Sequence, residues 1–196
     1  MRIGVLAAQG AFAEHLNTLC RMGLGAVPVR LPEQLEGIDG LIIPGGESTT
    51  ISKLMLAYDL RDRVIELIKH GFPVFGTCAG MIMLAKKVVD GNGVQPLQVM
   101  DITVRRNAFG RQKDSFEADL RIEALGETPF HAVFIRAPLI ESVGPSVNVM
   151  SRLDNGTIVA ARQENMLVSS FHPELTQDTR FHQYFLDMVR DNSEKV

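Results

Sequence analysis

A cysteine framed by two glycines is the strongest chemical signal in the sequence. Cys78 lies between Gly76 and Gly80, where a predicted strand ends and a predicted helix begins. This is the Gly-x-nucleophile-x-Gly pattern of a nucleophile elbow, with cysteine in place of serine. The pattern predicts that Cys78 is a nucleophile and that the N–H of Ala79 points to a developing oxyanion. The alternative interpretation is a small buried cysteine on a strand–helix turn.

A base and an orienting carboxylate follow near the end of the chain. His172 and Glu174 flank Pro173, and an extended backbone would project residues i and i+2 to the same side. Proline cannot donate to a sheet ladder, so this run is expected at a strand end. Glu174 would then hold one imidazole nitrogen of His172 while the other faces Cys78, as in a Cys-His-Glu triad. Alone, the run is more typical of a polar strand end followed by a turn than of a catalytic pair.

The sequence predicts no metal site. A His-x-Glu run occurs in zinc deaminases, but together with a Pro-Cys-x-x-Cys motif, which this chain lacks. The other histidines, at positions 15, 70, 131 and 182, lie in or beside predicted helices and a strand. They are expected to be surface or structural residues.

A glycine-rich turn follows the predicted strand over residues 40–44. The run Gly-Gly-Glu-Ser-Thr-Thr over residues 45–50 frees backbone N–H groups for a ligand, and Ser48 or Thr49 could cap the next helix. It lacks the Gly-Lys-Ser/Thr end of a phosphate-binding loop. Beside an elbow cysteine it is a candidate second oxyanion donor, whereas an ordinary strand–helix turn is the alternative.

Arginines gather in the second half of the chain. Arg105, Arg106 and Arg111 surround a glycine and a phenylalanine, and Arg136 follows a predicted strand. A guanidinium group suits bidentate recognition of a carboxylate. A solvated charged loop is the alternative.

The elements that must position these groups indicate an α/β fold. In the first half, apolar runs alternate with amphipathic stretches. Strands are expected over residues 3–7, 26–30, 40–44 and 73–75, and helices over 11–22, 49–56, 61–69 and 79–87. This alternation predicts a mostly parallel sheet with helices on both faces and chemistry at the carboxyl ends of its strands.

The second half predicts an antiparallel extension of that sheet. Period-2 segments cover residues 102–105, 116–122, 132–135, 147–151, 157–162 and 166–171. An Asn155-Gly156 pair predicts a tight hairpin. A last helix is expected over residues 178–190, followed by a frayed polar tail. No repeat or linker divides the chain, so residues 1–196 are expected to form a single domain with one shared core.

Composition limits the class of protein. The chain has 196 residues, 45% of them hydrophobic, and a formal net charge of −3. This residue composition excludes a disordered chain. The slightly acidic net charge argues against a nucleic-acid binder, which usually has a basic surface. Two cysteines are too few for a disulfide framework. No long apolar run or apolar leader is present, so a cytoplasmic protein without membrane contact is expected.

Together, the Gly-Gly turn, the cysteine elbow and the His-Pro-Glu run resemble the class I (triad) glutamine amidotransferases. Runs over residues 44–50, 75–80, 106–112, 114–117, 134–138 and 171–175 resemble the glutaminase subunits of two-protein pyridoxal 5′-phosphate synthases. The resemblance implies a flavodoxin-like α/β fold and hydrolysis of L-glutamine to glutamate and ammonia through a cysteinyl thioester, with no cofactor or metal. It also implies a (β/α)8-barrel synthase partner that uses the ammonia for vitamin B6 biosynthesis.

Carried over by position, the resemblance makes Cys78 the nucleophile, His172 the base and Glu174 its orienting partner. It gives oxyanion donors at Gly46 and Ala79. The residues that it assigns to glutamine binding are Gly46, Glu47, Ser48, Arg106, Ile135 and Arg136.

The chain departs from that family's usual pattern at a few positions outside the triad. Residues 7–8 are Ala-Ala where Gly-Leu is usual, Arg105 replaces an acidic residue, Ala108 replaces serine, and residues 168–169 are Val-Ser where Gly-Cys is frequent. Three alternatives stay open: an amidotransferase of another pathway, a freestanding cysteine hydrolase, and a catalytically silent binding module. The intact triad counts against the last of these.

Overall fold

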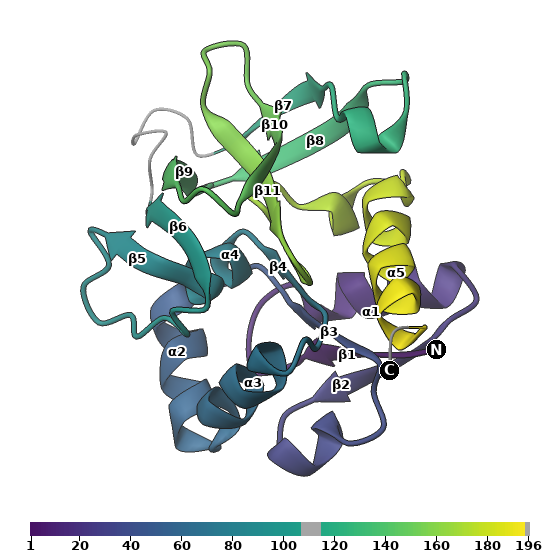
Figure 1. The fold of residues 1–196 in the computed structure, drawn as a ribbon, viewed down its shortest axis with the longest axis vertical. Helices are drawn as coiled ribbons and strands as arrows, with labels where there is room; N and C mark the ends of the chain where they lie inside the picture. Colours follow the sequence, from purple (N-terminus) through teal and green to yellow (C-terminus); the bar gives the residue numbers. More distant parts are fainter. Residues whose placement is uncertain (107–114, 195–196) are drawn as a thin grey trace.

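A parallel sheet continued by antiparallel strands runs through the molecule (Figure 1). The computed structural model describes residues 1–106 and 115–194. Within these ranges, one large sheet has the strand order β2-β1-β3-β4-β12-β11-β9-β6-β5, with β10 paired to β11, while β7 and β8 form a separate hairpin. The strands are β1 (Arg2–Leu6), β2 (Gly25–Val29), β3 (Gly40–Ile43), β4 (Val74–Thr77), β5 (Ala85–Val89), β6 (Met100–Arg105), β7 (Ser115–Leu120), β8 (Phe130–Ile135), β9 (Leu139–Val143), β10 (Asn148–Arg152), β11 (Ile158–Gln163) and β12 (Met166–Ser169). The helices are α1 (Phe12–Arg21), α2 (Ser48–Ala57), α3 (Leu60–Lys69), α4 (Ala79–Leu84) and α5 (Arg180–Ser193), with 3-10 turns η1 (Pro32–Leu35), η2 (Glu123–Leu125) and η3 (Pro173–Leu175).

Alternate residues of the central strands face two apolar cores. In β3, Leu41 and Ile43 belong to one core and Ile42 to the other, as the period of two in a strand requires. Helices α2, α3 and α4 contribute to the first core and α1 and α5 to the second, so helices cover both faces of the sheet (Figure 1). Each core also contains residues from both halves of the chain, among them Val104 and Val159. The predicted α/β fold with helices on both faces is confirmed.

The antiparallel extension is also present. Strands β11 and β12, β9 and β6, and β10 and β11 pair antiparallel. Between β10 and β11 the chain turns through Gly156 at a φ of +84°, and Asn155 Oδ1 accepts a hydrogen bond of 3.0 Å from the Thr157 N–H. The hairpin predicted from the Asn-Gly pair is therefore confirmed.

Strand β12 joins the parallel and antiparallel parts of the sheet. Its period-2 pattern placed it in the antiparallel extension, but it pairs with β4 in parallel, with Ser169 opposite Thr77, and antiparallel only with β11. Parallel neighbours end at the same edge of a sheet, which is where α/β proteins bind ligands. Residues that follow β4 and β12 are therefore brought together.

One predicted helix is too long. The sequence favoured a helix over residues 79–87, but α4 ends at Leu84 and the chain continues as β5. Strand β5 pairs in parallel with β6, and Val88 and Val89 lie in that pairing. Two β-branched residues in succession favour a strand, and the pairing with β6 overrides the helical pattern of the preceding turn.

Two further segments differ from expectation. Strand β9 was not predicted, although it pairs with both β6 and β11. Residues 191–193, expected to fray, continue α5, where Asn165 Nδ2 donates to Asn192 Oδ1 at 3.2 Å. A tertiary contact therefore orders a polar segment that the sequence favours as a tail.

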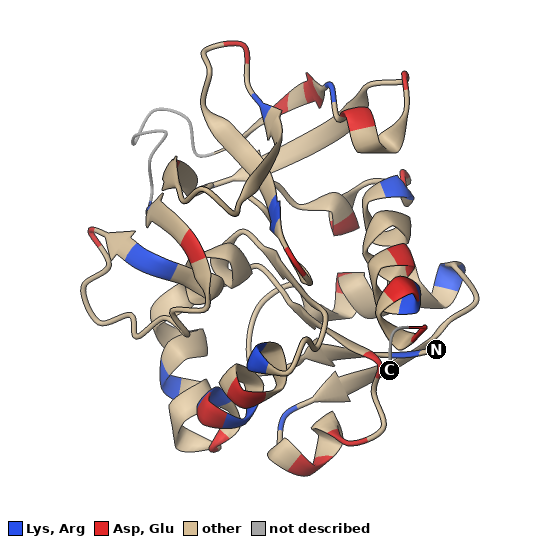
Figure 2. Cartoon of the chain, in the orientation of Figure 1, with Lys and Arg blue, Asp and Glu red and all other residues tan. Residues whose placement is uncertain are grey.

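Charge is mixed over the surface rather than separated into faces. Figure 2 shows basic and acidic residues interspersed along α3 and α5. Among the described residues, no helix has the length and apolar character needed to cross a membrane.

Candidate active site

The chain turns sharply at Cys78, between β4 and α4. Cys78 has a φ of +49°, a region that side chains other than glycine rarely occupy and that costs about 1–3 kcal/mol. A Cβ on Gly80 would lie 2.8 Å from the Ile43 carbonyl carbon and closer still to its oxygen, and a Cβ on Gly76 would lie 2.6 Å from the Gly80 carbonyl carbon. Both glycines are therefore required, and the strained residue between them has the geometry of a nucleophile elbow.

His172 and Glu174 meet behind the cysteine. The Nδ1 of His172 lies 2.7 Å from Glu174 Oε1. The predicted extended backbone is wrong here, because β12 ends at Ser169 and Pro173 begins the 3-10 turn η3. A proline is pre-organised for the first turn of a helix, and this turn brings residues i and i+2 together as an extended strand would have done.

Electrostatics favour a protonated His172 beside an ionised Glu174. Burial opposes a charge on His172, but hydrogen bonding to Cys78 and Glu174 outweighs it and raises the pKa of His172 to about 10. Burial likewise opposes a charge on Glu174, yet the neighbouring His15 and the hydrogen bond from His172 lower the pKa of that carboxyl below its usual value. Glu174 is therefore an ionised acceptor that holds the Nδ1–H of His172.

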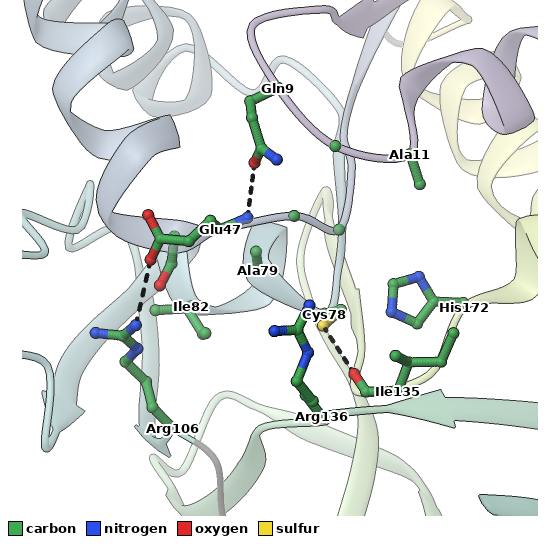
Figure 3. Close-up of a pocket in the computed structure, with 14 residues that line it drawn as sticks. Gln9, Ala11, Glu47, Cys78, Ala79, Ile82, Arg106, Ile135, Arg136 and His172 are labelled. Carbon is green, nitrogen blue, oxygen red and sulfur yellow. Dashed lines mark hydrogen bonds and ion pairs between the residues drawn. The ribbon is translucent and has the colours of Figure 1, made fainter. Parts of the chain in front are cut away.

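A cavity of about 430 Å³ opens over Cys78 (Figure 3). Cys78 and His172 face it, and Cys78 Sγ lies 3.9 Å from the carbonyl oxygen of Ile135. The cavity is lined by Gln9, Gly10, Ala11, Gly45, Gly46, Glu47, Ser48, Cys78, Ala79, Ile82, Arg106, Ile135, Arg136 and His172. Every residue assigned to glutamine binding or to the oxyanion therefore lies on its wall, while Glu174 lies behind His172.

The glycine-rich turn is held from both sides. The Gly45 N–H donates to Thr77 Oγ1 at 3.1 Å, and the Gly45 carbonyl accepts from the Ala11 N–H at 2.9 Å. Gln9 Oε1 accepts from the Glu47 N–H at 2.7 Å (Figure 3). The loop before α1 therefore fixes the peptides on either side of Gly46.

Glu47, rather than Ser48 or Thr49, caps α2. Its carboxylate accepts hydrogen bonds from the Thr49 and Thr50 N–H groups at 3.1 and 2.7 Å and from both threonine hydroxyls. Despite an opposing contribution from burial, these bonds lower the pKa of Glu47 to about 2. Arg106 Nη2 lies 3.5 Å from Glu47 Oε1 (Figure 3), which gives the cavity a negative and a positive group side by side.

The remaining arginines differ in whether they line the cavity. Arg136 lines the cavity with an unusual φ of +43°. Arg105 does not line it and instead pairs with Asp90 at 2.9 Å and with Glu141. Arg111 and Ala108 lie outside the described residues.

Two histidines near the triad were missed. His15 and His182 are fully buried, so of the two expected alternatives, surface or structural, they are structural residues, whereas His70 and His131 are exposed. His15 Nε2 lies 3.3 Å from Glu174 Oε2, and His15 Nδ1 lies 3.0 Å from His182 Nε2. A signal was available, because position 15 lies on the apolar face of α1 with Leu19, and position 182 adjoins the apolar face of α5.

A cluster of histidines and a carboxylate could suggest a metal. In the described part of the chain, however, no group of three or more His, Cys, Asp or Glu side chains has a geometry that could hold a metal ion. The arrangement instead suits nucleophilic attack by a thiol on a carbonyl, with a base, an orienting carboxylate and backbone N–H donors nearby.

Comparison with known proteins gives a consistent result. Residues 5–191 match the model of the SNO glutamine amidotransferase family. A protein of Dehalococcoides mccartyi named "Pyridoxal 5'-phosphate synthase subunit PdxT" is 58% identical over 192 residues, covering 97% of this chain and 98% of the relative. A protein of the same name from Herpetosiphon aurantiacus is 56% identical over 190 residues, covering 96% of this chain and 100% of the relative.

Solved structures agree on the fold. A crystal structure described as a glutamine amidotransferase superposes with a TM-score of 0.91 at 50% identity, over 96% of this chain and 98% of its own. A putative GMP synthase protein from Thermoplasma acidophilum gives a TM-score of 0.72 at 16% identity, over 99% of this chain and 96% of its own. The second likeness concerns the fold alone.

Proposed function

The chain belongs to the SNO glutamine amidotransferase family, and on that basis we propose that it is a glutaminase that supplies ammonia to a pyridoxal 5′-phosphate synthase. The observation that carries the proposal is the elbow cysteine beside the His172–Glu174 pair, at the floor of a cavity lined by Arg106 and Glu47. The shared name of its relatives supports the same pathway.

In the proposed mechanism, His172, whose pKa is raised to about 10, already holds the proton of the pair, and Cys78 attacks the γ-amide carbon of glutamine as a thiolate. The N–H groups of Gly46 and Ala79 stabilise the oxyanion of the tetrahedral intermediate. The protonated His172 gives its proton to the departing ammonia, which leaves a glutamyl thioester on Cys78. His172 then takes a proton from water, the resulting hydroxide releases glutamate, and Glu174 keeps the Nδ1–H of His172 in place throughout.

The polar ends of glutamine find complementary groups on the cavity wall. The guanidinium of Arg106 suits the α-carboxylate, and the ionised carboxylate of Glu47 suits the α-ammonium group. Ser48, Ile135 and Arg136 complete the proposed binding set. The side-chain amide is thereby directed to the opposite end of the cavity, where Cys78 lies.

The proposed partner is the (β/α)8-barrel synthase subunit that receives the ammonia. The relatives are named as subunits of that synthase, which supports this partner over an amidotransferase of another pathway. A free catalytic thiol needs a reducing environment, which supports a cytoplasmic location. The mechanism requires neither a metal nor a cofactor, because transfer of an acyl group to a thiol needs none.

The test is glutamine hydrolysis by the full chain in the presence of the synthase subunit. Cys78→Ala is expected to abolish glutamate release, whereas Cys20→Ser, which changes the exposed cysteine, retains the wild-type rate. Glutamine labelled with ¹⁵N on the amide is expected to deliver label into pyridoxal 5′-phosphate. Glutamate release by Cys78→Ala at the wild-type rate would refute the role of Cys78, and label found only in free ammonia would refute the pathway.

A further inference from the structure

The proposed mechanism leaves one oxygen of the triad carboxylate without a role. Glu174 Oε1 holds His172, but Oε2 is buried and receives no well-directed hydrogen bond among the described residues. A buried carboxylate oxygen without a donor is costly, because ionised groups lose the most on leaving water. The side chain that comes near this oxygen is His15, whose Nε2 lies 3.3 Å away.

His15 lies at the centre of a buried network of polar side chains. Its Nδ1 lies 3.0 Å from His182 Nε2, and its Nε2 lies 3.2 Å from Thr77 Oγ1 as well as 3.3 Å from Glu174 Oε2. None of His15, His182 and Thr77 lines the cavity, and all three are buried. These side chains therefore reach the reaction only through the groups that they hold.

The protons of this side-chain network can be assigned from the ionised carboxylate of Glu174. An ionised carboxylate only accepts hydrogen bonds, so the nitrogen of His15 that faces Glu174 must carry a proton. Burial lowers the pKa of His15, despite the opposing effect of Glu174, and burial with the neighbouring His15 lowers the pKa of His182 to about 3. Both rings are neutral, so His15 Nδ1 accepts from the Nε2–H of His182, and the Nδ1 of His182, which has no partner in the described chain, carries no proton.

We propose that His15 is a positioning residue whose Nε2–H, 3.3 Å from Glu174 Oε2 and also in hydrogen-bond contact with Thr77 Oγ1, stabilises the carboxylate that orients His172. The assignment rests on the proposed glutaminase function. His182 supports it in turn, because its N–H selects the tautomer of His15 that has a proton to give.

The same histidine links the triad to the oxyanion turn. Thr77 Oγ1 accepts from the Gly45 N–H at 3.1 Å and lies 3.2 Å from His15 Nε2. The Nε2–H of His15 therefore lies between one acceptor that holds His172 and another that holds the N–H of Gly45, the residue before Gly46. A single side chain thus contacts the supports of both the base and the oxyanion donor.

The test compares two substitutions of His15 in the full chain with its synthase subunit. His15→Gln keeps an N–H donor at about the same distance from the backbone, whereas His15→Leu fills the space without a donor. His15→Leu is expected to lower kcat by about 10- to 100-fold, the range for loss of a hydrogen bond to a charged group, with KM for glutamine within about twofold. His15→Gln is expected to stay within about threefold of wild type.

Control variants separate positioning from stability. Leu19→Ala removes buried contacts one turn along the same helix, so it is expected to lower Tm without changing kcat at a temperature where it is folded. His182→Phe leaves His15 in place but removes the donor to its Nδ1, and it is expected to lower kcat with KM unchanged. If His15→Leu fails to fold, the kcat of His182→Phe tests the inference instead.

A readout without the partner keeps this inference distinct from the proposed function. Alkylation of Cys78 by iodoacetamide in a Cys20→Ser background is expected to slow in His15→Leu and His182→Phe and to be retained in His15→Gln. If the wild type releases no glutamate, the glutaminase proposal fails, while the order of alkylation rates still decides the role of His15. Equal rates in His15→Leu and His15→Gln, or a wild-type kcat in His182→Phe, would overturn the inference.

Discussion

Gly45 is the position where one added methyl group should damage catalysis without damaging the fold. A Cβ on Gly45 would lie 3.0 Å from His172 Nδ1, closer still to its Cε1, and 3.3 Å from Cys78 Cβ. The φ of Gly45 is not in the left-handed region, so alanine can adopt this backbone. The strain therefore falls on the imidazole ring, which is the free end of a side chain and can move.

The size of the effect follows from that displacement. To restore contact distance, the ring of His172 must withdraw by about 1 Å, and a misplacement of this size costs about 10²-fold in rate. Gly45→Ala is therefore expected to lower kcat for glutamine hydrolysis, measured with the synthase subunit, by about 100-fold. Tm should change by only a few degrees, because the added methyl also restricts the unfolded chain.

The matched control is Gly25→Ala. Gly25 lies in β2, and the nearest heavy atom to a Cβ there would be the Met1 carbonyl oxygen at 3.8 Å. Its kcat and Tm should equal those of the wild type. A folded Gly45→Ala protein with kcat within threefold of wild type would refute the argument that this turn sets the position of His172.

Three further variants test other parts of the site. Glu47→Ala removes the cap of α2 and should reduce the free energy of unfolding in urea by about 1 kcal/mol. Because Arg106 also loses its partner, KM for glutamine should rise severalfold. An unchanged KM would contradict the proposed binding role of Glu47. Gly80→Ala should lower the free energy of unfolding by about 3 kcal/mol or more, because the new Cβ meets the Ile43 carbonyl, whose backbone cannot give way; wild-type stability would contradict the elbow geometry. For His182, burial and the neighbouring His15 hold the folded pKa at about 3, below its ordinary value of 6.5, so the unfolded state binds the additional proton between these pH values. From pH 6.5 to pH 5, the wild-type free energy of unfolding should therefore fall more steeply than that of His182→Phe, by up to about 1.4 kcal/mol per pH unit, and parallel curves would contradict this assignment.

The local patterns of the sequence predicted what local physics decides. The glycines on either side of Cys78 predicted the elbow because the close approach of α4 to β3 leaves no room for a Cβ. The alternation of strands and helices predicted helices on both faces for a similar reason, since each amphipathic element must bury one face. Both features are visible in residues only a few positions apart, although the contact that requires Gly80 is with the distant Ile43.

Features that depend on distant partners were not predictable in the same way. Residues 85–87 continue a helical pattern, but pairing of β5 with β6 makes them a strand. Ser48 and Thr49 are favoured capping residues, yet Glu47 caps α2, and its side chain also meets Arg106 from a distant part of the chain. In each case a tertiary contact selects one of several local possibilities.

The triad shows how far spacing can carry an argument. Positions i and i+2 predicted that His172 and Glu174 would meet, and they do, but through the 3-10 turn η3 rather than an extended strand. The apolar faces of α1 and α5 indicate that His15 and His182 could be buried, but they do not show that the two histidines meet each other beside Glu174. Burial of a polar residue on an apolar helix face is informative only once its partner is known.

The order of strands in the sheet, rather than spacing in the sequence, assembles the site. Gly45, Cys78 and His172 are far apart along the chain, but each follows one of three adjacent parallel strands, β3, β4 and β12. Parallel neighbours end at one edge, so the proposed oxyanion turn, nucleophile and base are placed side by side. Because β12 is also antiparallel to β11, His172 follows the strand at which the antiparallel extension joins the parallel part of the sheet, so its position depends on both parts.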